Sequence, residues 1–278
     1  MKPLVVIGDA LLDRDLSGRV ERVCPGEPAP VFDEADAADR PGGAALAAVL
    51  AALGDRPVQL VASVGRDPAG QRLRQLIEEA GVELLELSEV DMTPEKVRLR
   101  VGSRTVLRLD RNSAPAPVGA PGPSAQRALA DAACVLVSDY GRGTTSANEV
   151  RRLIAACAAT RPVVWDPHPR GGSPVPRLRL VVPNESELPG GTGKGSIASL
   201  TQAAFGARNR WRASAVAVTL GERGALLVDG GGVPLMVRPP VRGDGDACGA
   251  GDRFAAAATA ALADGAVTSE AVSAAVEA

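Results

Sequence analysis

The sequence predicts an α/β fold with a mostly parallel central sheet. Short apolar runs typical of buried strands recur along the chain, and segments with helical patterns lie between them. This alternation favours strand–helix–strand units with helices on both faces of the sheet. At 278 residues the chain is long enough for one large domain or two small ones, and we expect a single domain over residues 1–278.

The expected elements follow one another in regular order. The first apolar run begins directly after Met1-Lys2-Pro3, and each later run is followed by a helical segment or a Gly/Pro-rich turn. The expected strands are residues 4–7, 58–64, 134–138, 163–165, 180–182 and 215–219. The expected helices are residues 44–53, 69–80, 124–132, 147–159, 197–210, 251–263 and 269–277.

Two segments, residues 14–40 and 96–110, break this alternation with extended or Pro-punctuated sequence. Residues 97–101 alternate apolar and charged side chains, and residues 105–110 follow a Gly-Ser turn. We expect these segments to form a small β-sheet that is inserted into the α/β body and projects as a lid. Ordinary surface hairpins are the alternative.

The composition excludes several classes of function. Lys and Arg number 31 against 33 Asp and Glu, and aromatic residues make up 2%, so neither a basic surface nor stacking platforms for nucleic acid are expected. No apolar run reaches membrane-spanning length, and the N-terminal run is too short for a secretory signal. The four cysteines are scattered and there is one histidine, which favours a cytoplasmic protein without a His-rich metal centre.

The run Gly249-Ala250-Gly251-Asp252 precedes an alanine-rich helical segment. Glycines and the free N–H groups of a helix N-terminus suit an anion such as a phosphate. A carboxylate at that place would repel the anion, unless it accepts a proton from a hydroxyl that attacks a phosphoryl group. The alternative is a Gly-rich turn in which Asp252 caps the helix.

Two further motifs carry groups that suit a sugar. Asp9 and Asp13 follow the first strand, where carboxylates can accept hydrogen bonds from vicinal hydroxyls. Gly42 and Gly43 lie in a turn that opens the first helix and would let a polyol or a phosphate approach the backbone. Turn formation and capping are the alternative for both motifs.

Together these motifs resemble, in their order, those of the PfkB or ribokinase-like carbohydrate kinases. The resemblance covers nearly the whole chain and is closer still to the kinase domain of D-glycero-β-D-manno-heptose 7-phosphate kinases. It implies a three-layer ribokinase-like fold. The residues that carry it are GDALLDR at 8–14, RPGGAA at 40–45, RLD at 108–110, LVSDYGRG at 136–143, DP at 166–167, PNESE at 183–187 and GAGD at 249–252.

The resemblance also implies roles for particular residues. Asp252 matches the catalytic base, and Gly249, Ala250 and Gly251 match the backbone anion hole. Positions that match substrate-binding residues are Asp9, Asp13, Gly42, Gly43 and Asp139. Positions that match nucleotide- and Mg²⁺-binding residues are Thr219, Gly221 and Gly224 for the nucleotide, and Asn184 and Glu187 for the nucleotide-bound metal.

Three basic residues lie on the expected lid. Lys96, Arg98 and Arg108 would suit the distal phosphate of a sugar phosphate, and solvated charges on an exposed strand are the alternative. The implied activity is ATP-dependent phosphorylation of the anomeric hydroxyl of a heptose 7-phosphate. The implied partners are a small-molecule substrate, ATP, Mg²⁺ and, through the lid, a second copy of the chain.

Three departures from the family pattern qualify this expectation. Leu46 stands where the family carries an Asn that contacts the sugar, and His168 stands where heptose kinases carry a Lys. The chain ends at Ala278 without the Asn-containing run that completes the adenine pocket, so the C-terminal end of the family fold is expected to be missing. Kinases of another sugar phosphate or a nucleoside, or a weakly catalytic binding protein with a kinase fold, are the alternatives.

Overall fold

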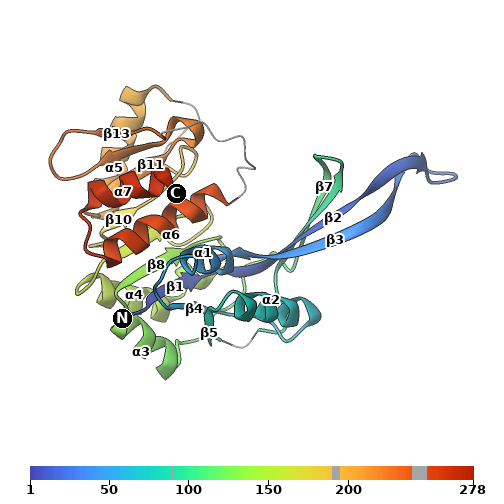
Figure 1. Cartoon of the computed structure of the whole chain (residues 1–278), viewed down its shortest axis with the longest axis horizontal. Coiled ribbons are helices and arrows are strands. Elements are labelled where there is room, and N and C mark those ends of the chain that lie inside the picture. The colour runs from blue at the N-terminus through green and yellow to red at the C-terminus, as the bar shows by residue number, and fades with distance from the viewer. Residues whose placement is uncertain (89, 190–194, 240–248) are drawn as a thin grey trace.

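A nine-stranded sheet forms the centre of the molecule in the computed structural model, which describes residues 1–88, 90–189, 195–239 and 249–278 (Figure 1). The strand order is β13-β12-β11-β10-β9-β8-β1-β4-β5. The strands from β11 to β5 are parallel, and β12 and β13 add an antiparallel edge. The bounds are β1 Leu4–Gly8, β4 Val58–Ala62, β5 Glu83–Glu86, β8 Cys134–Ser138, β9 Val163–Asp166, β10 Leu180–Val181, β11 Val216–Thr219, β12 Ala225–Val228 and β13 Leu235–Val237.

Helices cover both faces of this sheet, which gives three layers. Alternate residues of β1 show the division, because Leu4 and Val6 belong to one apolar core and Val5 and Ile7 to the other. Helices α1 Ala44–Ala51, α2 Pro68–Glu79, α6 Ala250–Ala263 and α7 Thr268–Glu277 pack on the first face. Helices α3 Pro123–Asp131, α4 Asn148–Ala158 and α5 Ile197–Trp211 pack on the second.

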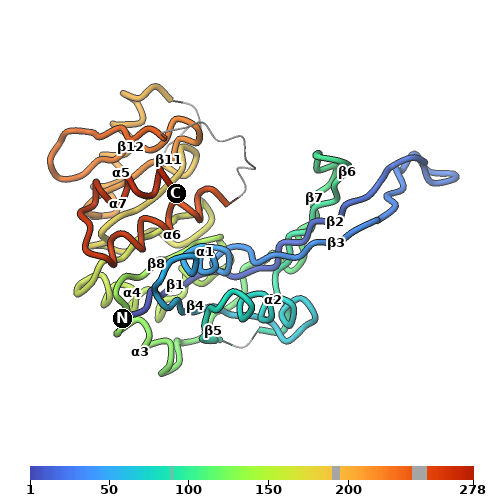
Figure 2. The backbone as a smooth tube through the Cα atoms, in the orientation of Figure 1, coloured from blue at the N-terminus to red at the C-terminus, as the bar shows by residue number. Residues whose placement is uncertain are grey.

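A second sheet projects from this body, with the strand order β3-β2-β6-β7 (Figures 1 and 2). Its strands are β2 Ala10–Val23, β3 Pro30–Gly43, β6 Glu95–Val101 and β7 Arg104–Arg111. β2 and β3 form a long antiparallel hairpin, and β6 pairs with β2 in parallel. We call these four strands the projecting sheet.

The projecting sheet begins deeper in the body than the sequence indicates. The structure extends the first two strands to Ala10 and Gly43, beyond the expected limits of 14 and 40. Leu11 and Leu12 are buried at the base of β2, and the N–H of Leu12 donates to the carbonyl of Pro94. Asp13 therefore lies within a strand, and Gly43 ends a strand immediately before α1.

The α/β prediction is confirmed, and so are the six expected strands and seven expected helices, with shifted ends. Three strands were missed. β5, β12 and β13 have only four, four and three residues and lie at or next to the edges of the sheet, where the alternating or apolar signal is short. Among the residues that the structure describes, none of the helices combines the length and apolarity needed to cross a bilayer.

The parallel strands bring their carboxyl ends to one edge of the sheet, beside the start of α6. Asp9 follows β1, Asp139 follows β8, Asp166 ends β9 and Thr219 ends β11. The close pairing of β1 and β8 depends on Gly8, since a Cβ there would overlap the carbonyl oxygen of Ser138. Ligands of open parallel sheets bind at this edge.

Candidate active site

A pocket of about 270 Å³ lies at the carboxyl ends of the parallel strands. Its wall combines several carboxylates with the glycines that start α6, so it offers both anionic groups and backbone donors. The lining residues are Asp139, Tyr140, Asp166, Pro167, His168, Val182, Asn184, Glu187, Thr219, Gly249, Gly251 and Asp252.

Asp252 lies in the first turn of α6 with only 5% of its surface exposed. The hydroxyl of Tyr140 lies 2.9 Å from Oδ1 and 2.8 Å from Oδ2 of this carboxylate, to which it donates. Tyr140 comes from the loop after β8, so this bond joins two segments that are far apart in the sequence. The carboxylate is thereby held at one orientation in the pocket wall.

Burial raises the pKa of Asp252 to about 6, because water no longer solvates its charged form. The Tyr140 hydrogen bond and the nearby Lys96 act in the opposite direction, since both favour the carboxylate anion. At neutral pH the group is therefore mostly ionised, yet it is a stronger base than an exposed aspartate. That combination suits general base catalysis.

Tyr140 is itself held by two neighbours. Lys96 Nζ lies 5.7 Å from the centroid of its ring, and the His168 ring stacks on it with centroids 6.5 Å apart. Burial, together with the charge of Asp252, raises the pKa of the Tyr140 hydroxyl, so it stays protonated and remains a donor.

The N-terminus of α6 supplies the backbone donors of the site. Gly249 has φ 87°, a left-handed conformation that favours glycine, and the helix starts at Ala250. The first backbone bond of the turn runs from the N–H of Arg253 to the carbonyl of Gly249. The N–H groups of the preceding residues have no helical partner and carry the positive end of the helix dipole. Leu46 of α1 approaches this turn beside Gly249.

A second pocket, of about 240 Å³, adjoins the first. The two share Thr219 and Gly251, so the start of α6 stands between them. Gly221 and Gly224 both have positive φ and shape the short 3₁₀ turn at Gly221–Arg223 that borders this pocket. The lining residues are Thr219, Gly221, Gly224, Pro239, Ala250, Gly251, Arg253, Phe254, Ala275, Val276 and Ala278.

Asn184 and Glu187 form a compact turn at the edge of the first pocket. The Glu187 carboxylate accepts the N–H of Asn184 at 2.8 Å, and Asn184 Oδ1 accepts the N–H of Glu187 at 3.2 Å. Burial raises the pKa of Glu187. Within the described ranges no group of three or more His, Cys, Asp or Glu side chains could hold a metal ion directly.

Asp9 organises the loop after β8 through three hydrogen bonds. Its Oδ2 accepts the N–H groups of Tyr140 and Arg142, each at 3.0 Å, and its Oδ1 accepts the N–H of Thr144 at 3.1 Å. The Asp9 carboxylate, expected from the sequence to bind sugar, is thus turned toward the protein backbone. It acts as the anchor that places Tyr140.

Asp139 and Asp166 give the pocket its remaining carboxylates. The hydroxyl of Thr145 donates to Asp139 at 2.7 Å, and the N–H of Gly141 donates at 2.8 Å. Burial raises the pKa of Asp139 to about 6 despite these bonds. Burial also raises the pKa of Asp166, and the nearby negative charges of Asp252 and Glu187 raise it further.

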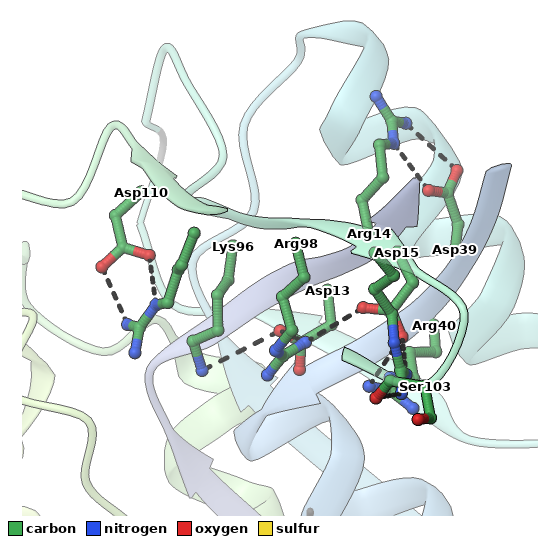
Figure 3. Close-up of polar contacts among 11 residues, drawn as sticks. Asp13, Arg14, Asp15, Asp39, Arg40, Lys96, Arg98, Ser103 and Asp110 are labelled. Atoms are coloured by element: carbon green, nitrogen blue, oxygen red, sulfur yellow. Dashed lines mark hydrogen bonds and ion pairs between the residues drawn. The ribbon is translucent and has the colours of Figure 1, made fainter. Parts of the chain in front are cut away.

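The basic residues expected on the lid are engaged with carboxylates (Figure 3). Arg98 lies 3.2 Å from Asp13 and 3.4 Å from Asp15, and Lys96 lies 3.8 Å from Asp13. Arg108 is half-exposed and forms a two-pronged pair with Asp110, with both hydrogen bonds at 2.8 Å.

Asp13 also packs closely against Gly42. A Cβ on Gly42 would lie 2.7 Å from Asp13 Oδ2, so the absence of a side chain at Gly42 makes room for this buried carboxylate. Gly43, with φ 61°, bends the chain so that the N–H of Ala44 donates to the carbonyl of Asp9.

The structure thus brings most of the expected residues together. Those that line the two pockets are Asp139, Asn184, Glu187, Thr219, Gly221, Gly224, Gly249, Ala250, Gly251 and Asp252. The expected site residues that line neither pocket are Asp9, Asp13, Gly42, Gly43, Lys96, Arg98 and Arg108. Sequence reasoning missed Tyr140 and Asp166. Asp166 could have been found because it ends a strand at the ligand-binding edge, whereas the pairing of Tyr140 with Asp252 has no signal in the sequence.

Comparison with known proteins agrees with this architecture. Residues 1–278 match the pfkB family carbohydrate kinases. The bifunctional protein HldE of Streptomyces coelicolor is 50% identical over 280 residues, which cover 99% of this chain and 58% of that protein. The bifunctional protein HldE of Caulobacter vibrioides is 37% identical over 284 residues, covering 97% and 57%. The chain therefore spans less than two thirds of these relatives.

Solved structures show the same fold at lower sequence identity. Arabidopsis thaliana ribokinase complexed with ribose and ATP superimposes with a TM-score of 0.75 at 22% identity, covering 98% of this chain and 89% of the other. Phosphofructokinase-2 from Escherichia coli in complex with fructose-6-phosphate gives a TM-score of 0.71 at 20% identity, covering 98% and 90%. The expected ribokinase-like fold is confirmed, and the chain belongs to the pfkB family of carbohydrate kinases.

The Tyr140 contact predicts how Asp252 titrates. Because the hydroxyl favours the charged carboxylate, Tyr140→Phe should raise the pKa of Asp252 above its wild-type value of about 6. Thr145→Val is the matched control, since it should raise the pKa of Asp139 and leave Asp252 unchanged. Carbon-13 NMR titration of the aspartate carboxyls measures both. An Asp252 midpoint near 4 in the wild type, or one unmoved by Tyr140→Phe, would contradict this description.

Proposed function

We propose that this chain phosphorylates the anomeric hydroxyl of a heptose 7-phosphate with ATP, forming the 1,7-bisphosphate. The observation that carries the proposal is the buried Asp252 carboxylate at the start of α6, beside backbone donors and between two pockets. Family membership supports sugar phosphorylation, and the motifs shared with heptose 7-phosphate kinases support the substrate class.

In this reaction Asp252 accepts the proton of the attacking hydroxyl. The hydroxyl oxygen forms a bond to the γ-phosphorus of ATP while the bond from that phosphorus to the β–γ bridging oxygen breaks, and ADP leaves. The N–H groups at Gly249–Gly251 stabilise the charge on the transferring phosphoryl group. Tyr140 holds the base in place throughout, because its hydroxyl contacts both carboxylate oxygens.

Each of the two pockets binds one of the two substrates. The sugar occupies the pocket lined by Asp139 and Asp252, and the nucleotide occupies the pocket bordered by Gly221, Gly224 and α7. The transferred phosphate lies where they meet, at Gly251 and Thr219. The shared wall supports a position of the γ-phosphate next to the base.

The donor set near the phosphate fits Mg²⁺ held mainly through water. Glu187 offers a carboxylate, whereas the amide oxygen of Asn184 on the same turn already accepts hydrogen bonds from Ser186 and Glu187. Mg²⁺ commonly keeps several waters and takes one or two carboxylates besides the phosphates. When bound, it would neutralise phosphate charge.

The projecting sheet acts as the lid. Asp13 stands at its base beside Gly42, and its carboxylate is proposed to accept hydrogen bonds from sugar hydroxyls. Lys96 connects the lid to the base, since it lies near both Asp13 and the Tyr140 ring. Closure would exclude water and limit ATP hydrolysis.

Replacing Asp252 tests the proposal. Asp252→Asn removes the proton acceptor but keeps the shape, so turnover with heptose 7-phosphate should fall by about 10²- to 10⁴-fold while ATP binding stays within about threefold. Asp264→Asn, on the residue that caps the other end of α6, is the matched control and should keep wild-type turnover. Coupled ADP-release assays and calorimetry with an ATP analogue measure the two quantities.

The same assays decide between substrates. A panel of heptose, hexose and pentose phosphates and nucleosides should give its highest kcat/KM with heptose 7-phosphate. Preference for another acceptor would overturn the substrate but keep the kinase, whereas turnover of Asp252→Asn within tenfold of wild type would overturn the mechanism. Binding without any turnover by the wild type would favour a binding protein.

We further propose that the chain forms a homodimer through the projecting sheet in the cytoplasm. Strand β7 is exposed along its whole length and presents Val106, Leu107 and Leu109 to solvent. Such an apolar edge strand favours pairing with another strand. Sedimentation equilibrium should give a dimer for the wild type and a monomer for Leu107→Lys. A monomeric wild type would contradict the pairing.

A further inference from the structure

Arg142 is a buried cation without a matching anion. Only 8% of its surface is exposed. Its guanidinium donates to the carbonyl of Asn112 at 3.5 Å, the limit of a hydrogen bond. Among the described residues no carboxylate lies within ion-pair distance of it. Arginines of the projecting sheet, in contrast, form ion pairs with carboxylates, as Arg98 does with Asp13 and Arg108 with Asp110.

This burial is costly, because a buried charge needs a partner. Burial lowers the pKa of Arg142, and Asp110 and Asp9 offset this only from a distance. Arg170 and Arg108 lower it further by repulsion. Arg170 and Arg142 also act on His168, whose pKa is lowered by burial, by these two cations and by Lys96. Positive charges therefore gather around this loop and repel one another.

A small cavity of about 60 Å³ adjoins Arg142. It has room for more than one water molecule and for a single tetrahedral oxyanion. Asp9 also lines it, but both of its oxygens accept backbone N–H groups of the loop. The lining residues are Gly8, Asp9, Ala10, Ser63, Val90, Met92, Pro94, Asn112, Ala114, Ala116, Val118, Arg142 and Thr144.

The loop after β8 carries both Tyr140, which lines the proposed sugar pocket, and Arg142, which lines the small cavity. The backbone N–H of Arg142 donates to Asp9 at 3.0 Å, in the same set of bonds that places Tyr140 against Asp252. The same short loop therefore positions both Arg142, with any ligand it binds, and Tyr140, which contacts the proposed base. The lid arginines suit this task less, because Arg98 already pairs with Asp13 and Asp15, and Arg108 with Asp110.

We propose that Arg142 binds the phosphate monoester of the sugar substrate, remote from the hydroxyl that reacts. This inference rests on the proposed function and makes it more specific. The chain selects sugars that already carry a phosphate, because the buried Arg142 binds that phosphate. A guanidinium suits the task because it donates two parallel hydrogen bonds to phosphate oxygens.

The test compares Arg142→Met with a matched control. Arg161→Met also removes an arginine that donates to a backbone carbonyl, that of Ala132, and should bind all ligands like the wild type. Calorimetry with D-glycero-D-manno-heptose 7-phosphate should give about 10- to 100-fold weaker binding for Arg142→Met. The parent heptose, which lacks the phosphate, should bind the wild type and Arg142→Met equally.

Stability separates a binding role from a structural one. Arg142→Met should unfold at the same temperature as the wild type or higher, because it removes a poorly paired buried charge. A lower melting temperature together with equal loss of affinity for heptose and heptose 7-phosphate would mean that Arg142 only supports the loop, and would overturn the proposal.

Inorganic phosphate distinguishes the anion site from the substrate. Millimolar phosphate should raise the melting temperature of the wild type and of Arg161→Met but not that of Arg142→Met. If this holds while heptose 7-phosphate neither binds nor reacts, the anion site stands and the proposed substrate fails. If heptose 7-phosphate binds Arg142→Met as tightly as the wild type, the anion site fails and the proposed function stands.

Discussion

A carboxylate kept away from water at the start of a helix is the constraint on which the rest of this structure depends. Burial disfavours the charge of Asp252, and the free backbone donors at the start of α6 offset this only in part, so other groups support the carboxylate. The Tyr140 hydroxyl provides this support directly. Tyr140 in turn depends on the loop after β8, which Asp9 holds by three backbone hydrogen bonds. The first strand of the sheet thereby positions the base.

Tyr140 also stands between two regions of opposite charge. Asp139, Asp166 and Glu187 gather on the pocket side, and burial raises the pKa of each. Cations gather on the other side, where Lys96 lies over the ring and Arg142 follows in the loop. Under the proposed function, this polarity would orient a sugar phosphate with its reacting hydroxyl toward the carboxylates and its phosphate toward Arg142.

The sequence was sufficient for six strands of the central sheet, the helices and the GAGD turn, because strand and helix periodicities are local, whereas it missed the three short strands β5, β12 and β13. It was insufficient where long-range geometry decides. Asp9 carries the residue type of a sugar ligand, but its oxygens face a loop more than 130 positions away. Arg108 has the charge of a phosphate ligand but pairs with Asp110, two residues along the same strand. The bond from Tyr140 to Asp252 spans 112 positions, and no periodicity encodes it.

The dependence of kcat/KM on pH tests most directly whether Asp252 acts as the base. Its pKa of about 6 predicts a plateau above neutrality and a fall that approaches tenfold per pH unit well below 6, as the proton acceptor becomes occupied. Melting temperatures over the same range establish that the protein remains folded. A rate that stays constant down to about pH 5, with the protein folded, would contradict the central role of this carboxylate.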